Sequence, residues 1–260
     1  MTTFIDDRRV IDAVASPAQY FYFSMALACA AVAFLGFAPT FFLPLALGKF
    51  LAPPSIMIHG IVFFAWSLFF VYQAWLPAAG QTGRHRTVGI IGVSLATTMT
   101  IFGLIAGVTS MQRAVAMDQK DAGLAFSIVP WSGILFFAVV FAIGIAMVRR
   151  PEVHKRLMLL AGISILDAAV ARWFLTFLAP PGPPGPPPVA VTIPPALVAY
   201  LLLVVAIVND WRTRGRPHKV YVIGGLALVA VKLLNLPISE THAWHAFAGA
   251  ILTLSQGPLI

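Results

Sequence analysis

Long apolar runs separated by short polar connections dominate the chain from about residue 20 onward. Most of these runs have the length that a transmembrane helix needs, roughly 20 residues. The pattern predicts an all-α fold: a polytopic transmembrane bundle of seven spans that forms a single domain over residues 1–260. Pro39 and Pro44 are expected to kink or end the first span. The seven runs are Tyr20–Thr40, Ile56–Leu76, Val88–Ser110, Phe126–Val148, Leu157–Leu178, Pro195–Val208 and Val220–Leu236.

The C-terminal stretch Glu240–Ile260 has no flanking charges that fix its placement. Three alternatives are open for it: an eighth span, a re-entrant segment or an interfacial helix. In each of them the start of the stretch, with Glu240, His242 and His245, lies near the outer face.

Positive charge gathers in alternate connections, and this pattern predicts the orientation. Lys and Arg collect on the cytoplasmic side of membrane proteins, so these connections and the N-terminal segment 1–19 are expected in the cytoplasm. The opposite side carries the proline-rich loop 179–194, where the run APPGPPGPPP favours a stiff polyproline II spacer over a docking site. The residues that carry the charge are Arg8, Arg9, Arg84, Arg86, Arg149, Arg150, Lys155, Arg156, Arg212, Arg214, Arg216 and Lys219.

Composition supports the membrane interpretation. Of the 260 residues, 60% are hydrophobic and 10% are charged, whereas soluble domains carry about 25% charged residues. The net charge of +8 lies between apolar runs, so it indicates topology and excludes nucleic acid as the partner. The lipid bilayer is the expected partner. The start MTTFIDDRRV lacks the features of a signal peptide, so the first span is expected to remain. Cys29, the single cysteine, is expected to be a small buried hydrophobe.

Three of the spans that run outward begin alike. Their starts read GRHRTVGIIG, RRPEVHKRLMLLAG and RGRPHKVYVIGG, and each places a histidine directly before a basic residue. The histidines are His85, His154 and His218. Two interpretations are open: a degenerate repeat of helical hairpins, or the ordinary gathering of basic and amphipathic residues at this interface.

Two opposite charges fall within predicted spans at similar depth. Asp167 and Lys232 lie thirteen and fourteen residues after the histidines that open their spans, which places both about 20 Å along their helices. An unpaired charge near the bilayer centre costs ~2.5–3.5 kcal/mol, so we expect an Asp167–Lys232 pair that faces the bundle interior. It is either a proton or ion relay or an interhelical clamp. Arg172 points about 140° away from Asp167 and is expected to be an interfacial anchor, with a place in the pair as an option.

The histidines are candidate ligands for a cofactor. On the outer side His59, Glu240, His242 and His245 have the side chains that bind zinc, copper or iron, and the spacing of the last two suits one helical face. Haem b needs histidines on facing helices, which either His85 with His154 or His59 with His245 would supply. A satisfied polar group at the interface is the alternative for each of them.

The motifs HGIVFFAWSLFFVYQ, GRHRTVGIIG, RRPEVHKRLMLLAGISILDAAVARW and THAWHAFA resemble those of an uncharacterised family of bacterial multi-pass inner-membrane proteins. The resemblance implies a location in the bacterial cytoplasmic membrane and no particular activity. Ser55 and His59, taken with the later His-x-x-His, also partly resemble the seven-span zinc hydrolases of the ceramidase and adiponectin-receptor type. That family has a wider gap in its last histidine pair and an aspartate in the third span, and this chain has neither.

Three classes of function follow. The sequence narrowly favours a redox-type module that binds haem or a metal through histidines at the span ends. The alternatives are a proton, ion or small-molecule transporter that uses Asp167 and Lys232, and a non-catalytic accessory subunit that packs against other subunits of a larger membrane complex. An intramembrane zinc hydrolase is the weakest alternative. No nucleotide-binding loop, nucleophile elbow or HExxH motif is present.

Overall fold

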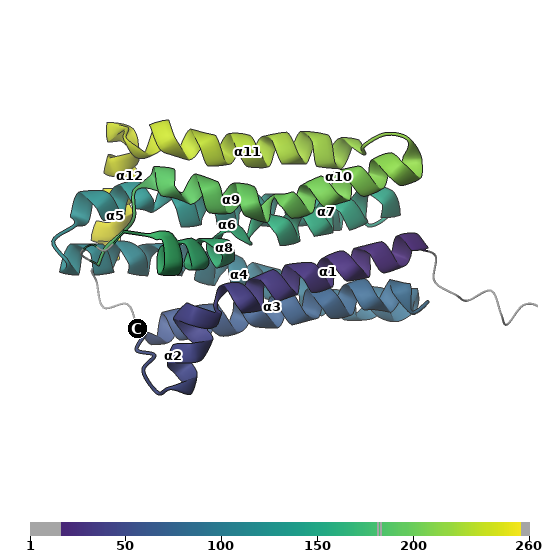
Figure 1. Ribbon diagram of the computed structural model, residues 1–260, viewed down its shortest axis with the longest axis horizontal. Coiled ribbons are helices and arrows are strands. Elements are labelled where there is room, and N and C mark those ends of the chain that lie inside the picture. The colour runs from purple at the N-terminus through teal and green to yellow at the C-terminus, as the bar shows by residue number, and fades with distance from the viewer. Residues whose placement is uncertain (1–16, 181, 183, 256–260) are drawn as a thin grey trace, which may run out of the picture.

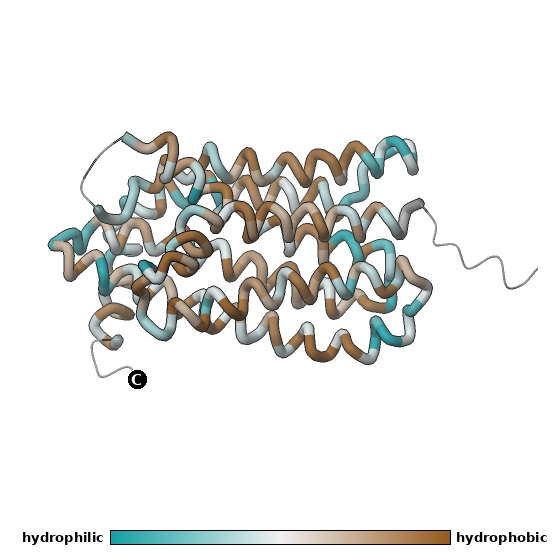
Figure 2. The backbone as a smooth tube through the Cα atoms, turned by 60° about the horizontal axis from the view of Figure 1, so that its bottom comes forward, coloured by the Kyte–Doolittle hydropathy of each residue, from teal (hydrophilic) through white to brown (hydrophobic). Residues whose placement is uncertain are grey.

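The computed structural model describes residues 17–180, 182 and 184–255, and these residues form an elongated bundle of helices (Figure 1). No strand occurs among them. Hydrophilic residues gather toward the two ends of the bundle and hydrophobic ones along its length (Figure 2). This is the distribution that a bilayer imposes, because only the ends of a spanning helix reach water. The all-α fold predicted from the apolar runs is therefore confirmed, and its long helices are apolar enough to cross a membrane.

Six helical segments are long and apolar enough to cross a membrane, and a seventh span exists if a bent pair of helices counts as one. Several spans consist of two or three consecutive helices. The helices are α1 (Pro17–Gly36), η2 (Ala38–Phe42), α2 (Leu43–Ala46), α3 (Pro54–Ala78), α4 (Thr82–Ala116), α5 (Lys120–Phe126), α6 (Ile128–Ala146), α7 (Pro151–Ser164), α8 (Asp167–Trp173), η3 (Phe174–Leu178), η4 (Val189–Thr192), α9 (Ile193–Ala199), α10 (Leu201–Arg214), α11 (Lys219–Ser239) and α12 (His242–Leu254).

The first span is the bent pair. It turns by 41° between α1 and the segment Ala38–Ala46, which contains Pro39 and Pro44 as the sequence predicted. Proline has no N–H to donate and its ring crowds the preceding turn, so a helix bends or changes pitch there. The π-helical turn η2 is the local form that this change takes.

The C-terminal stretch does not form an eighth span within the described residues. After α11 the chain turns at Glu240 and Thr241 into α12, whose 13 residues are about 20 Å long, short of the roughly 30 Å hydrocarbon core. The short helix packs against α4, α5 and α11. Gln112 of α4 donates a hydrogen bond to the Ser255 carbonyl at 3.2 Å, which fastens the end of α12 to the bundle.

The spans pack around one large apolar core. Helices α1, α3, α4, α6, α7, α10 and α11 all contribute buried side chains to it. Leu159, Leu160 and Ile163 of α7 are fully buried there, so α7 lies at the centre of the bundle. The span that begins with α7 therefore holds its later residues, including Asp167, among several neighbours at once.

Close packing between α1 and α8 depends on Gly36. A methyl group added at Gly36 would lie 2.6 Å from the backbone oxygen of Ala169, which cannot move aside as a side chain can. We expect Gly36→Ala to lower the free energy of unfolding by about 1–3 kcal/mol, the usual effect of overpacking. Unfolding of the purified protein in detergent measures this.

Gly249 of α12 is the matched control, because nothing lies within 4 Å of a methyl group added there. Gly249→Ala should leave stability unchanged or raise it by up to about 1 kcal/mol, since alanine favours helix more than glycine does. Equal stability of the two variants would contradict the close approach of α1 and α8.

Candidate functional site

The two opposite charges that lie within spans form an ion pair. Lys232 Nζ of α11 lies 2.6 Å from Asp167 Oδ2 of α8. The lysine side chain is 7% exposed and the aspartate side chain 20% exposed, so the aspartate is the more exposed member of the pair. The expected contact between Asp167 and Lys232 is present.

The pair lies at the level where two spans are interrupted. The chain leaves helical geometry between Ser164, the last residue of α7, and Asp167, the first residue of α8. Ser164 Oγ donates to the carbonyl of Ala161 at 2.8 Å, a local bond that competes with the backbone ladder and often bends helices. A second interruption falls at Tyr200, between α9 and α10.

These interruptions lie at similar depth. We define the basic end of the bundle as the end where α7 begins and α10 joins α11, on the right in Figure 1. Arg150, Arg214 and Lys219 lie at these helix termini. Counted from the helix termini there at about 1.5 Å per residue, Asp167 lies about 24 Å, Tyr200 about 21 Å and Lys232 about 20 Å along their spans. All three therefore belong to one layer near the middle of the bundle's length.

Other polar side chains surround the pair in this layer. Asn235 Nδ2 donates a hydrogen bond to Ser132 Oγ at 2.9 Å, which joins α11 to α6. Ser132, Asn235, Ser164 and Tyr200 line a cavity of about 10 Å³ together with Asp167 and Lys232, a volume close to what one water molecule needs. We call these six residues the central polar layer.

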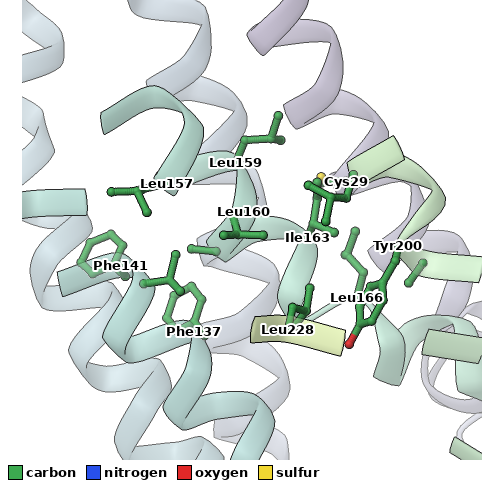
Figure 3. Packing of buried hydrophobic residues seen from close by; sticks show 14 of the residues in the cluster. Cys29, Phe137, Phe141, Leu157, Leu159, Leu160, Ile163, Leu166, Tyr200 and Leu228 are labelled. Carbon is green, nitrogen blue, oxygen red and sulfur yellow. The ribbon is translucent and has the colours of Figure 1, made fainter. Parts of the chain in front are cut away.

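Buried apolar side chains of α6, α7 and α11 pack together between the central polar layer and the basic end, and we call them the apolar plug; Figure 3 shows their packing. Leu157, Leu160 and Ile163 of α7 precede Asp167 along the span, and Phe137 and Leu228 pack against the same core. The plug residues are buried, with at most 8% of any one exposed. Water has no polar path through such a core, so the central polar layer is closed toward the basic end.

Four members of the central polar layer were not singled out from the sequence. Ser132, Ser164, Asn235 and Tyr200 stand singly within apolar runs, and small or neutral polar residues are common in spans because they bond to the helix backbone. The available signal was Asn235, since an amide within a span needs a partner from another helix.

A second buried ion pair was missed entirely. Arg156 of α7 and Asp210 of α10 are 3% and 0% exposed, and Arg156 Nε donates to Asp210 Oδ2 at 2.9 Å. The sequence placed Arg156 in a basic connection as a topology signal, whereas its guanidinium lies inside the bundle. The signal for its partner was Asp210 itself, an acidic residue at the end of an apolar run among basic neighbours.

The Arg156–Asp210 pair ties several helices together near the basic end. Arg156 Nη1 also reaches Glu152 at 2.7 Å, and its guanidinium lies 5.9 Å from the centre of the Tyr221 ring of α11. Asp210 Oδ2 accepts a hydrogen bond from the backbone N–H of His218 at 3.1 Å. Because its donors and acceptors are satisfied, this pair is a structural clamp.

Each of the three histidines that stand directly before a basic residue at a helix start has a structural role. His85 Nδ1 lies 3.1 Å from the carbonyl of Gln73, and His154 Nδ1 lies 2.8 Å from the carbonyl of Gly144. Each of these rings therefore fastens the start of one helix to the helix before it. His218 caps α11 by accepting the N–H of Val220 at Nδ1.

The rings of His85 and His154 also approach one another. Their centres are 6.2 Å apart and the ring planes meet at 73°. Of the two histidine pairs predicted from the sequence for haem, this is the one that the structure brings into contact.

The outer candidates His59 and Arg172 make aromatic contacts. His59 of α3 lies with its ring centre 4.1 Å from that of Phe63, and its buried Nδ1 has no hydrogen-bond partner among the described residues. The Arg172 guanidinium lies 5.4 Å from the centre of the Phe37 ring. Among the described residues Arg172 takes part in no ion pair, so the Asp167–Lys232 pair forms without it.

The remaining outer candidates lie around the start of α12. Glu240 and His242 are exposed, and His245 Nε2 bonds to the carbonyl of Ser239 at 2.9 Å. Within the part of the chain that the structure describes, no three His, Cys, Asp or Glu side chains gather as a metal ion would need. The structure therefore does not bring His59, Glu240, His242 and His245 together as a set, because α12 packs against α4, α5 and α11 while His59 lies on α3.

Replacing Asp210 tests the buried clamp. We expect Asp210→Asn to lower the free energy of unfolding by about 3–5 kcal/mol, because it leaves the Arg156 charge without its buried partner. Unfolding in detergent gives the value, and Asp121→Asn at an exposed position of α5 is the control. The double variant Arg156→Met/Asp210→Leu should be less destabilised than Asp210→Asn. The reverse order would contradict the pairing.

The cap at His218 predicts a pH dependence of stability. Partial burial and the charges of Arg156 and Arg214 lower the pKa of His218 below its ordinary 6.5, against the opposing effect of Asp210. The unfolded chain therefore binds more protons than the folded chain between the folded pKa and 6.5, so the free energy of unfolding rises with pH through this window and falls as the pH drops.

Unfolding of the wild-type protein and of His218→Asn between pH 5 and pH 8 measures this contribution. Asparagine also caps helices but does not titrate, so the variant should lose part of the pH dependence while it keeps the stability at pH 8. Identical pH profiles would count against the cap.

Comparison of the chain with protein-family models, curated proteins and solved structures gave no match. The proposed function therefore rests on the site alone.

Proposed function

We propose that this protein moves protons across a membrane, with Asp167 as the group that takes up and releases the proton. The single observation that carries the proposal is the Asp167–Lys232 pair, held beside a water-sized cavity that the central polar layer lines in part, where two spans are interrupted. Ionisable groups inside a membrane are rare and mark proton or ion pathways. Interrupted helices near the bilayer midplane are a common way to build such sites.

Lys232 is the resident counter-charge of Asp167 in this proposal. Before Asp167 takes up a proton, the ammonium of Lys232 keeps the carboxylate ionised. The two opposite charges then lie together, which avoids an isolated charge in the bilayer. When Asp167 takes up a proton, the attraction is lost and Lys232 is released to the polar groups around it. The neighbouring hydroxyl groups and the amide of Asn235 can then hydrogen-bond the neutral carboxyl group.

Access to the site is proposed to change by bending at the two interruptions. The apolar plug closes the central polar layer toward the basic end, whereas the Asp167 carboxylate is the more exposed member of the pair. The break before Asp167 and the one at Tyr200 are the places where α7 and α10 can tilt relative to α8 and α9. Such a tilt would open the apolar plug toward the basic end and close the access of Asp167 to the opposite end of the bundle.

The proposed setting is the cytoplasmic membrane of a bacterium, with the basic end and the N-terminus in the cytoplasm. The support is the charge of the connections at the basic end, which follows the positive-inside rule.

The accessory-subunit interpretation stays a prediction. Metal binding by histidines is favoured by one separate observation, the approach of His85 and His154.

Proton flux into liposomes that contain the purified protein and an internal pH-sensitive dye tests the proposal. With a membrane potential imposed by potassium and valinomycin, the wild-type protein should acidify the lumen faster than empty liposomes do. Asp167→Asn and Lys232→Met should each reduce the rate to that of empty liposomes, and Asp167→Glu should retain part of it. Asp121→Asn is the control and should behave as wild type.

The double variant Asp167→Leu/Lys232→Leu separates function from folding. Replacing a buried ion pair by apolar side chains of similar size often preserves stability, so this variant should be folded and inactive. Wild-type flux in the double variant, or no flux above empty liposomes in the wild-type protein, would overturn the proposal. The same liposomes with a sodium-sensitive dye in place of the pH-sensitive dye show whether sodium is carried instead of protons, which would also contradict the proposal.

A further inference from the structure

The two histidines near the basic end occupy equivalent places on their helices. His85 is the fourth residue of α4 and His154 is the fourth residue of α7. Both rings are half-buried. They belong to different hairpins, so nothing in the local sequence requires them to meet. Their approach is a property of the folded bundle.

The hydrogen bonds of the two rings fix which nitrogen is available. A carbonyl oxygen can only accept, so Nδ1 of each ring carries the proton that it donates to Gln73 or Gly144. In a neutral imidazole the other nitrogen, Nε2, then presents a lone pair. No hydrogen bond among the described residues uses Nε2 of either ring. Metal-bound histidines are typically held in this way, with the second nitrogen donating to a backbone carbonyl.

The distance between the rings suits one metal ion between them. An ion bound at the ~2.0–2.1 Å usual for imidazole nitrogen lies about 3.2 Å from the centre of that ring. Two imidazoles on opposite sides of one ion are therefore about 6.4 Å apart, centre to centre. The observed separation of 6.2 Å is within a few tenths of an ångström of this value.

The surroundings decide which ion fits. Zinc in proteins takes four ligands as a rule, and the described residues gather no group of three His, Cys, Asp or Glu. Arg84, Arg86 and Lys155 adjoin the two histidines in sequence, and Glu152 is already bound by Lys155 and Arg156. This positive environment repels a doubly charged ion more strongly than a singly charged one, and two neutral donors suit an ion that accepts two ligands in line. Cu(I) has both properties and binds imidazole.

We infer that His85 and His154 form a two-coordinate site for a single Cu(I) ion at the basic end of the bundle. The inference is independent of proton transport, because it uses neither Asp167 nor Lys232. Gln73, which holds His85 through its carbonyl, also has a buried side-chain Nε2 without a partner. This amide is available to an additional polar ligand of the ion.

Anaerobic titration of the full-length protein in detergent with Cu(I), buffered by a chromophoric Cu(I) chelator, tests the site. One equivalent should bind, and X-ray absorption should show two nitrogen neighbours. The histidines also fasten hairpins, so alanine variants risk misfolding. His85→Asn and His154→Asn keep an amide donor for the carbonyl but remove Nε2, and each should bind Cu(I) more than about 100-fold more weakly.

His242→Ala is the matched control, because this exposed histidine lies on α12 and outside the site. It should bind Cu(I) as the wild-type protein does. Four results would each overturn the inference: no stoichiometric binding, equal affinity in the asparagine variants, four-coordinate Zn(II) bound more tightly than Cu(I), or a purified protein whose Soret band is lost in these variants. Proton flux measured without copper distinguishes failure of this site from failure of the transport proposal.

Discussion

The ion pair between Asp167 and Lys232 is the interaction on which the rest of the bundle's interior depends. Either charge alone would cost ~2.5–3.5 kcal/mol near the bilayer centre, so the two helices that carry them must meet at this depth and in this register. The pair also requires polar side chains around it, and Ser132 and Asn235 provide them. It lies where α7 gives way to α8, and an unbroken helix would present Asp167 in a different direction.

The second ion pair, Arg156–Asp210, lies at another level of the bundle and has a different role. It is almost wholly buried and bonded on several sides, so it holds the helix ends near the basic end in place. The Asp167–Lys232 pair has fewer bonds, an adjacent cavity and a more exposed carboxylate. The Arg156–Asp210 pair is therefore suited to holding the structure and the Asp167–Lys232 pair to changing its bonding, and the apolar plug lies between them.

The sequence predicted the Asp167–Lys232 contact because depth along a straight helix can be counted from a shared starting point. It did not predict Arg156–Asp210, because a basic residue beside other basic residues is indistinguishable from a topology signal. Nor did it predict the breaks before Asp167 and at Tyr200, since both fall inside apolar runs that each have the pattern of one continuous span. The bend of the first span was predictable from its prolines. The outer histidines were expected to be able to converge, but this depended on which spans are neighbours, which the sequence does not contain.

The protonation state of Asp167 tests the central claim most directly, and infrared spectroscopy of protonated carboxyl groups measures it at neutral pH. An ionised pair predicts that the wild-type protein has no band that disappears in Asp167→Asn. Lys232→Met should gain such a band, because a carboxyl group without its counter-charge becomes neutral in the bilayer, and Asp167→Asn/Lys232→Met should lack it. A protonated carboxyl band in the wild-type protein that is lost in Asp167→Asn would contradict the account.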